Sequence, residues 1–164
     1  MHCIILYKFI DLNYIETIKT KSVKSILLAL FLLVAGSAVS FAQCDKKVSL
    51  SSSKTQHLDA GGTLQETVDE QTTIEISKSD IVVITDNGNQ KMTGTVKINT
   101  CDWKVPFKDG KTILNTTLNN DNGESKDFTL TIEGKDGKVT LLAESPSMPD
   151  KKIRLDIEKF EEKN

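Results

Sequence analysis

The sequence predicts an all-β protein, an antiparallel up-and-down meander of about eight to ten short strands that closes as a small barrel. Two features support this fold class. Apolar and polar residues alternate along most segments after residue 42, and four Asn-Gly or Asp-Gly pairs, which favour tight hairpin turns, lie between such segments. Successive short hairpins favour a meander, and closure removes its exposed edges. A two-sheet β-sandwich is the alternative that the same pattern allows.

The segment 126–144 shows the pattern most clearly. Its apolar residues occupy alternate positions on both sides of the pair Asp136-Gly137, which readily takes the positive φ of a hairpin turn. Each half therefore has one apolar and one polar face, as expected of a half-buried strand. The other turn pairs are Asn87-Gly88, Asp109-Gly110 and Asn122-Gly123.

The strands ahead of this hairpin are expected to be short. A strand opens at 47–50 and loosens at 51–54, and others are expected at 63–68, 73–77 and 81–84. Apolar residues then occupy even positions over 92–98 and odd positions over 101–107. This change of parity predicts a bulge or tight turn near 99–100. Pro106 predicts that the strand there lies at an edge or near its end.

The remaining strands complete the meander. One is expected at 112–118, before the hairpin, and the loop 145–150 follows the hairpin because its two prolines stop a strand. The segment 152–158 forms the last predicted strand, with Ile153, Leu155 and Ile157 inward. The charged end of the chain, 159–164, is expected to fray.

A small closed barrel of this layout resembles the lipocalin family. That family usually carries a Gly-x-Trp signature on its first strand, and no such signature occurs near Val48. The single tryptophan, Trp103, lies in the middle of the chain instead. The resemblance is therefore one of lipocalin-like layout, without membership of the family.

The N-terminal region, 1–42, has the order of a secretory signal peptide. Three lysines precede an apolar run at 26–36, and Ser40-Phe41-Ala42 supplies small residues where a signal peptidase cuts. We expect a signal-peptide helix, cleavage after Ala42, and export of a bacterial protein to the periplasm or the medium. An uncleaved anchor and a lipoprotein at Cys44 are the alternatives. The composition of 1–21 also suggests a true start near Val23.

The exported part, 43–164, is predicted to be a single β domain with no integral membrane span. It carries 17 Lys and Arg and 21 Asp and Glu, hence a net charge of 17 − 21 = −4, and these charges are interspersed. The absence of a basic face argues against nucleic acid as a partner. Its two cysteines, Cys44 and Cys101, are expected to form a disulfide, with two free buried thiols as the alternative.

The sequence offers no catalytic or metal-binding constellation, and we expect neither an enzyme nor a cofactor. His57 is the only histidine after residue 42 and lies in a polar stretch without a nucleophile motif, so we expect a solvated loop or strand-edge residue. The segment 119–124 is rich in Asn and Asp. However, the EF-hand spacing would put Leu118 at the first ligand position, so a polar hairpin turn explains it better.

Three residues are candidates for ligand binding. Trp103 and Phe107 are expected on the same strand face as Cys101, either as core packing or at the mouth of an apolar cavity, and Met148 lies between the prolines of the 145–150 loop. These features predict an exported, non-enzymatic barrel that holds a small apolar ligand or a protein partner. The alternative is a protein-interaction or inhibitor module with a filled core.

Overall fold

The computed structural model of the protein describes residues 44–163. The predicted signal peptide and its helix, the cleavage site after Ala42 and the start near Val23 lie outside these residues. Within the described part, no helix has the length and apolar character needed to cross a membrane.

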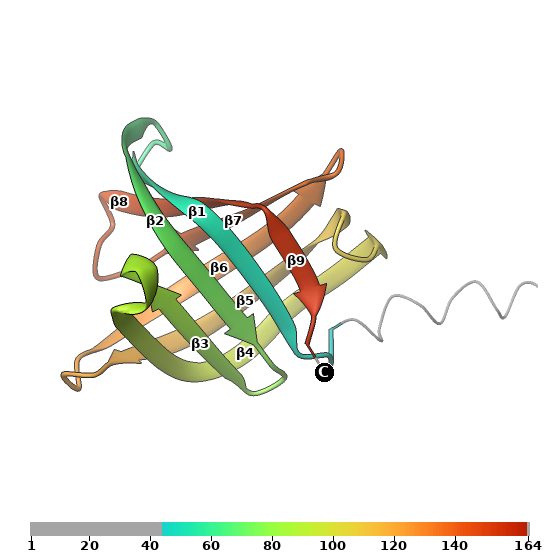
Figure 1. The fold of residues 1–164 in the computed structure, drawn as a ribbon, viewed down its shortest axis with the longest axis horizontal. Helices are drawn as coiled ribbons and strands as arrows, with labels where there is room; N and C mark the ends of the chain where they lie inside the picture. The colour runs from blue at the N-terminus through green and yellow to red at the C-terminus, as the bar shows by residue number, and fades with distance from the viewer. Residues whose placement is uncertain (1–43, 164) are drawn as a thin grey trace, which may run out of the picture. The chain divides into compact units, whose positions relative to one another are not determined.

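The described chain is built of strands joined mostly by short turns (Figure 1). One 3₁₀ turn, η1 (Asp86–Gly88), interrupts them. The strands, nine in residues 44–163, are β1 (Val48–Asp59), β2 (Leu64–Ile76), β3 (Asp80–Thr85), β4 (Gln90–Val105), β5 (Asp109–Asn120), β6 (Ser125–Lys135), β7 (Lys138–Glu144), β8 (Lys151–Ile157) and β9 (Lys159–Glu162).

The strands form a closed antiparallel meander. Consecutive strands pair from β1 to β8, and β8 returns to pair with β1 through residues such as Leu155, opposite Thr55. Eight strands therefore make a complete barrel, which confirms the predicted fold class over the sandwich alternative. Closure leaves the backbone groups of the first and last strands of the meander hydrogen-bonded to each other.

The C-terminal segment is ordered into the barrel wall, so the prediction that 159–164 frays is wrong for the residues described. The chain bends at Glu158, whose N–H donates to the Ser51 carbonyl at 2.9 Å. Strand β9 then pairs with the first four residues of β1. The bend lets β8 and β9 pair with successive halves of the long strand β1. The hydrogen bonds of this pairing outweigh the conformational entropy that a free chain end would keep.

Strand β1 also differs from expectation, because it continues through the serine stretch that was expected to loosen it. Its pairing with β2 shifts between Ser52 and Lys54. This irregularity changes which face of the strand points inward. Ser52 faces the interior before it and Thr55 after it. The short strands expected at 63–68 and 73–77 likewise join into the single strand β2.

The predicted irregularity near 99–100 is confirmed. The pairing of β4 with β5 shifts between Ile98 and Thr100, and β4 ends at Val105, directly before Pro106. Phe107 lies in the β4–β5 turn with a φ of 59° rather than on the strand, and Val105 is exposed. The turn thus forms two residues earlier than Asp109-Gly110, and this pair begins β5 instead.

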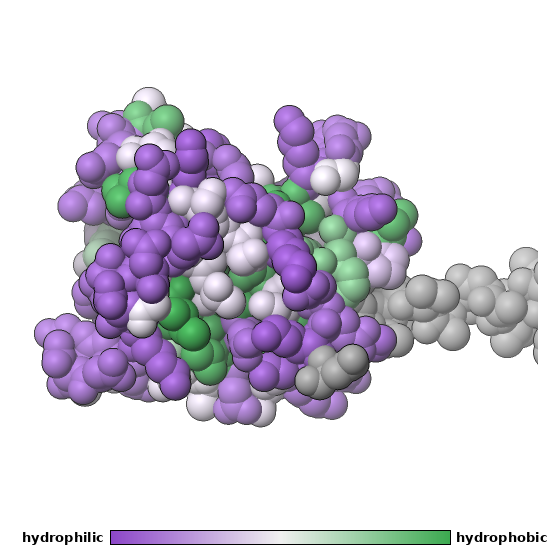
Figure 2. Space-filling view, in the orientation of Figure 1, coloured by the Kyte–Doolittle hydropathy of each residue, from purple (hydrophilic) through white to green (hydrophobic). Residues whose placement is uncertain are grey.

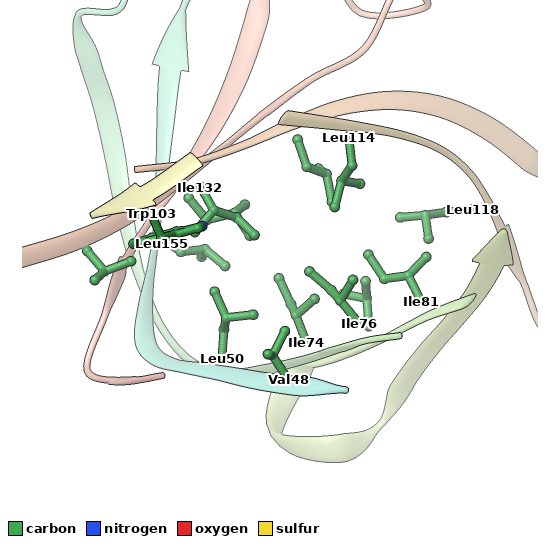
Figure 3. Packing of buried hydrophobic residues seen from close by; sticks show 14 residues of the cluster. Val48, Leu50, Ile74, Ile76, Ile81, Trp103, Leu114, Leu118, Ile132 and Leu155 are labelled. Atoms are coloured by element: carbon green, nitrogen blue, oxygen red, sulfur yellow. The ribbon is translucent and has the colours of Figure 1, made fainter. Parts of the chain in front are cut away.

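The barrel interior is aliphatic, as Figure 3 shows. Side chains from strands all round the wall point toward one interior; among them Leu50, Ile81, Leu114, Ile132 and Leu141 are almost fully buried. The exterior is polar. The face in Figure 2 is mostly hydrophilic, with a hydrophobic strip over β3 and a second hydrophobic area on the right of the view. Residues alternate inward and outward along each strand, so the alternation in the sequence maps directly onto these two surfaces.

Candidate functional site

The two ends of the barrel differ in how they are filled. Because neighbouring strands are antiparallel, the connections β1–β2, β3–β4, β5–β6 and β7–β8 lie at one end, called here the open end. The connections β2–β3, β4–β5 and β6–β7 lie at the other, called the closed end. The beginning of β1 and the end of β9 also meet at the closed end, where Lys163 N–H donates to the Lys47 carbonyl at 2.8 Å.

The closed end is filled by an aromatic cluster and a cysteine pair. The Trp103 side chain is buried, and its indole Nε1 donates to Thr112 Oγ1 at 2.8 Å. Phe160 of β9 packs edge-on against Trp103, with ring centroids 5.6 Å apart, and against Phe107, at 4.7 Å. A void of only about 30 Å³ remains beside these groups. This end has no room for a ligand.

The Cys44 and Cys101 sulfur atoms are at bonding distance, 1.84 Å, as expected for the predicted disulfide. This pair ties the segment ahead of β1 to β4, across 57 positions of sequence. It lies beside the Trp103 cluster and lines the same small void. The pair therefore belongs to the packing of the closed end.

The open half of the barrel contains a cavity of about 340 Å³. This volume is at the lower end of the range for small-molecule sites. The wall is mostly hydrocarbon. Its apolar side chains are Val68, Ile74, Val83, Met92, Leu118, Phe128, Leu130, Leu141, Ala143, Ile153 and Leu155. The cavity reaches the rim at Thr85 and Gln90, which flank the β3–β4 connection.

Six polar side chains complete the cavity wall, and they divide by depth. Thr55 and Thr72 are buried, 5% and 2% exposed, whereas the others are half-buried or exposed: His57, Glu70, Thr85 and Gln90. His57 and Glu70 are the only ionisable residues of the lining, which contains no lysine or arginine. The cavity thus combines an apolar body, two buried threonine residues and a more polar mouth.

The bulge in β1 creates part of this site. Strict alternation from Val48 and Leu50 would turn Lys54 inward. The shift after Ser52 turns Thr55 inward instead and leaves Lys54 outside, where its ammonium lies 3.7 Å from the Asp69 carboxylate. Ser52 itself holds the bulge, because its hydroxyl donates to the Lys54 carbonyl at 2.8 Å. A one-residue irregularity thereby replaces a buried cation by a neutral hydroxyl.

The residues that the sequence suggested for ligand binding do not line this cavity. Trp103 and Phe107 are brought together through Phe160 at the closed end. Met148 lies in the β7–β8 loop, on the open-end side, in a shallow surface depression with Pro146 and Pro149. Met148 therefore lies at the opposite end of the barrel from Trp103 and Phe107, and the role of all three in binding stays a prediction.

His57 is placed differently from expectation. It lies within β1, pairs with β2 and β8, and is half-buried at the cavity wall rather than solvated in a loop. The expectation was wrong because β1 runs on through the polar stretch. Among residues 44–163, no group of three or more His, Cys, Asp or Glu side chains could hold a metal ion.

Sequence reasoning missed both deep threonines. Thr72 had a usable signal, because it continues the alternation of Ile74 and Ile76 and so belongs to the inward face of β2. Thr55 had none, because its orientation depends on a bulge that forms only when β1 pairs with β2.

Inferences about function rest on this geometry, because comparisons with known proteins add none. No protein-family model matches the chain, and searches of curated proteins and of solved structures returned no significant match.

Proposed function

We propose that the protein is an exported, non-enzymatic binding protein that holds a small, mostly apolar ligand in the cavity of the open half of the barrel. The cavity of about 340 Å³ is the observation that carries this proposal. Protein interiors are normally packed almost without voids, and a hydrocarbon-lined space of this size costs the fold contacts that a ligand restores. Export is supported by the signal-like pattern at 26–42 and by the cysteine pair.

The alternative, an interaction module with a filled core, has less support. The closed end is filled, but the space between Leu118, Leu130 and Leu155 is hollow. Two large apolar residues of the described chain are exposed, Leu64 at the start of β2 and Val105 at the end of β4. They lie at opposite ends of the barrel and form no patch, and scattered apolar residues are normal on a protein surface.

A neutral fluorophore tests the proposal directly. N-phenyl-1-naphthylamine brightens when it enters an apolar site, and we expect saturable binding of one molecule per protein. Substitution Ala143→Phe fills the cavity and should weaken binding at least about tenfold. Ala60→Phe makes the same change on the exposed β1–β2 turn and serves as the control.

The two variants separate specific from surface binding. Circular dichroism and thermal unfolding establish that each variant is folded. Equal binding by wild type, Ala143→Phe and Ala60→Phe would place the probe outside the cavity and contradict the proposal. Mass spectrometry of lipids that co-purify from the native source identifies the natural occupant.

A further inference from the structure

The first half of β2 has one unpaired edge. Strand β1 pairs with β2 along most of its length, but β3 pairs with it only at residues 73–76. In Figure 1, β2 accordingly runs on beyond the end of β3. Toward η1, Gln71 N–H donates to Asn87 Oδ1 at 3.2 Å. Before that point, at 64–70, no strand of the described chain pairs with the side of β2 that faces away from β1.

This edge has the backbone groups that a further strand needs. Along a strand, alternate residues direct their N–H and C=O groups to opposite sides, so part of the backbone at 64–70 points away from β1. The residues of this stretch are exposed, apart from Val68 and Glu70, which are half-buried. An open edge of this kind pairs with an extended segment of another chain through main-chain hydrogen bonds.

The side chains along the edge restrict the partner. Val68 and Glu70 line the cavity, and Glu66 is opposite His57, another lining residue. One face of the edge therefore reads acidic, apolar, acidic at alternate positions. Neither glutamate forms an ion pair within residues 44–163. Because residues on adjacent strands meet in cross-strand pairs, a basic, an apolar and a basic residue at alternate positions complement this face.

The same charges disfavour a second copy of the chain as the partner. Antiparallel pairing of two β2 edges centred on Val68 puts Glu66 of each copy opposite Glu70 of the other. Centring the pairing on the next residue puts Asp69 opposite Asp69. Like charges directly opposite each other are destabilising. The edge thus selects against its own copy and in favour of a basic partner.

We propose that the edge of β2 at 64–70 binds an extended segment of a partner protein, in which an apolar residue has a lysine or arginine two positions away on each side. The apolar side chain lies beside Val68, and the two basic side chains lie beside Glu66 and Glu70. This site goes beyond the small ligand of the cavity. It does not depend on that ligand, because the unpaired backbone is present whether the cavity is empty or filled.

A titration of isotope-labelled wild type with the capped peptide acetyl-TKTVTKT-amide, followed by amide NMR shifts at low ionic strength, tests the proposal. We expect the shifts to concentrate at 64–70. The charge-reversed peptide acetyl-TETVTET-amide should bind at least about tenfold more weakly. Two further forms of the first peptide carry N-methyl groups on its odd or on its even amides. Only one of these sets faces β2, so only one form should lose binding.

A charge exchange on the protein provides the matching variant. Glu66→Lys/Glu70→Lys should reverse the preference, so that acetyl-TETVTET-amide binds at least about tenfold more tightly than acetyl-TKTVTKT-amide. Asp121→Lys/Asp150→Lys is the control, because it makes the same change in net charge on exposed turns at the same end of the barrel. It should keep the preference of wild type. Circular dichroism and thermal unfolding establish that both double variants are folded.

Several outcomes would overturn the proposal. Equal binding of the two peptides, equal affinities of the two N-methylated forms, or shifts centred outside 64–70 would each do so. Shifts at 64–70 that depend on the concentration of the protein alone would identify a second copy as the partner instead. Absence of binding at millimolar peptide would also overturn the proposal. Cavity binding would then remain intact, because the fluorophore measures it separately.

Discussion

At the scale of single residues, charges on the barrel exterior hold the two ends of the described chain together. Glu75 of β2 accepts from Lys47 Nζ at 2.8 Å and from Lys163 Nζ at 3.1 Å. Lys47 precedes β1 and Lys163 follows β9. The hydrogen bond from Lys47, and then that from Lys163, hold the pKa of Glu75 below its ordinary value of 4.5.

This lowered pKa predicts a pH-dependent contribution to stability. A carboxylate whose pKa is lower in the folded state stabilises that state above its unfolded pKa, and the contribution is lost as the pH falls through the folded pKa. We expect Glu75→Gln to lower the free energy of unfolding by about 0.5–1 kcal/mol at pH 7. The difference from wild type should vanish in acid.

Urea unfolding of both proteins between pH 7 and pH 2 measures this difference. Glu66→Gln is the control, because Glu66 is an exposed residue of the same strand that forms no ion pair within the described part of the chain. A Glu75→Gln deficit that persists unchanged at pH 2 would contradict the assigned role of the ion pairs.

At the scale of elements, glycines on β5 and β6 make room for the Trp103 ring. A Cβ atom added to Gly134 would lie 2.8 Å from Trp103 Cζ3 and 2.7 Å from the Lys108 carbonyl oxygen. A Cβ atom on Gly110 would lie 2.4 Å from Trp103 Cα. The packing of the closed end therefore depends on the lack of a side chain at Gly110 and Gly134 as much as on the aromatic side chains.

We expect Gly134→Ala to destabilise the protein by about 2 kcal/mol, because the added methyl group forces the ring or the β4–β5 turn to move. Gly61→Ala is the control, since its Cβ would lie 3.4 Å from Asp59 Oδ1, an ordinary contact. That change should stay within about 0.5 kcal/mol. Equal urea midpoints for the two variants would show that the closed end accommodates the methyl group.

At the scale of the whole molecule, the barrel is stabilised unevenly. The closed end has the aromatic cluster, the cysteine pair and the meeting of the chain ends, whereas the open half has the cavity. The packed closed end compensates for contacts that the hollow half lacks. This asymmetry suits the proposed binding role, because the packed end stabilises the barrel while the other half leaves space for a ligand.

The cysteine pair should contribute strongly to this stabilisation. A bond that spans 57 positions is worth up to about 4 kcal/mol in the chain-entropy model. We expect the double variant Cys44→Ser/Cys101→Ser to unfold at a clearly lower urea concentration than oxidised wild type. Wild type treated with reductant should match the variant, and an unchanged midpoint after reduction would mean that the thiols are not bonded.

Local patterns in the sequence were sufficient to predict an all-β meander. Alternation sets which face of each strand is apolar, and turn pairs such as Asn122-Gly123 and Asp136-Gly137 join neighbouring strands. Even the β4 irregularity was visible, because it interrupts an apolar row. These features depend on residues close together in the chain, so the sequence determines them by itself.

The candidate site depended on contacts that only the tertiary structure decides. Thr55 faces the cavity because β1 shifts its register against β2, and His57 lies in the wall because β8 closes on the far side of β1. The polar stretch around them has no alternation to reveal either fact. Likewise, the closed end is filled by Phe160, far in sequence from Trp103, while the open half is left hollow. The volume left inside the barrel depends on side chains from all the strands, and these strands pair with one another only in the folded barrel.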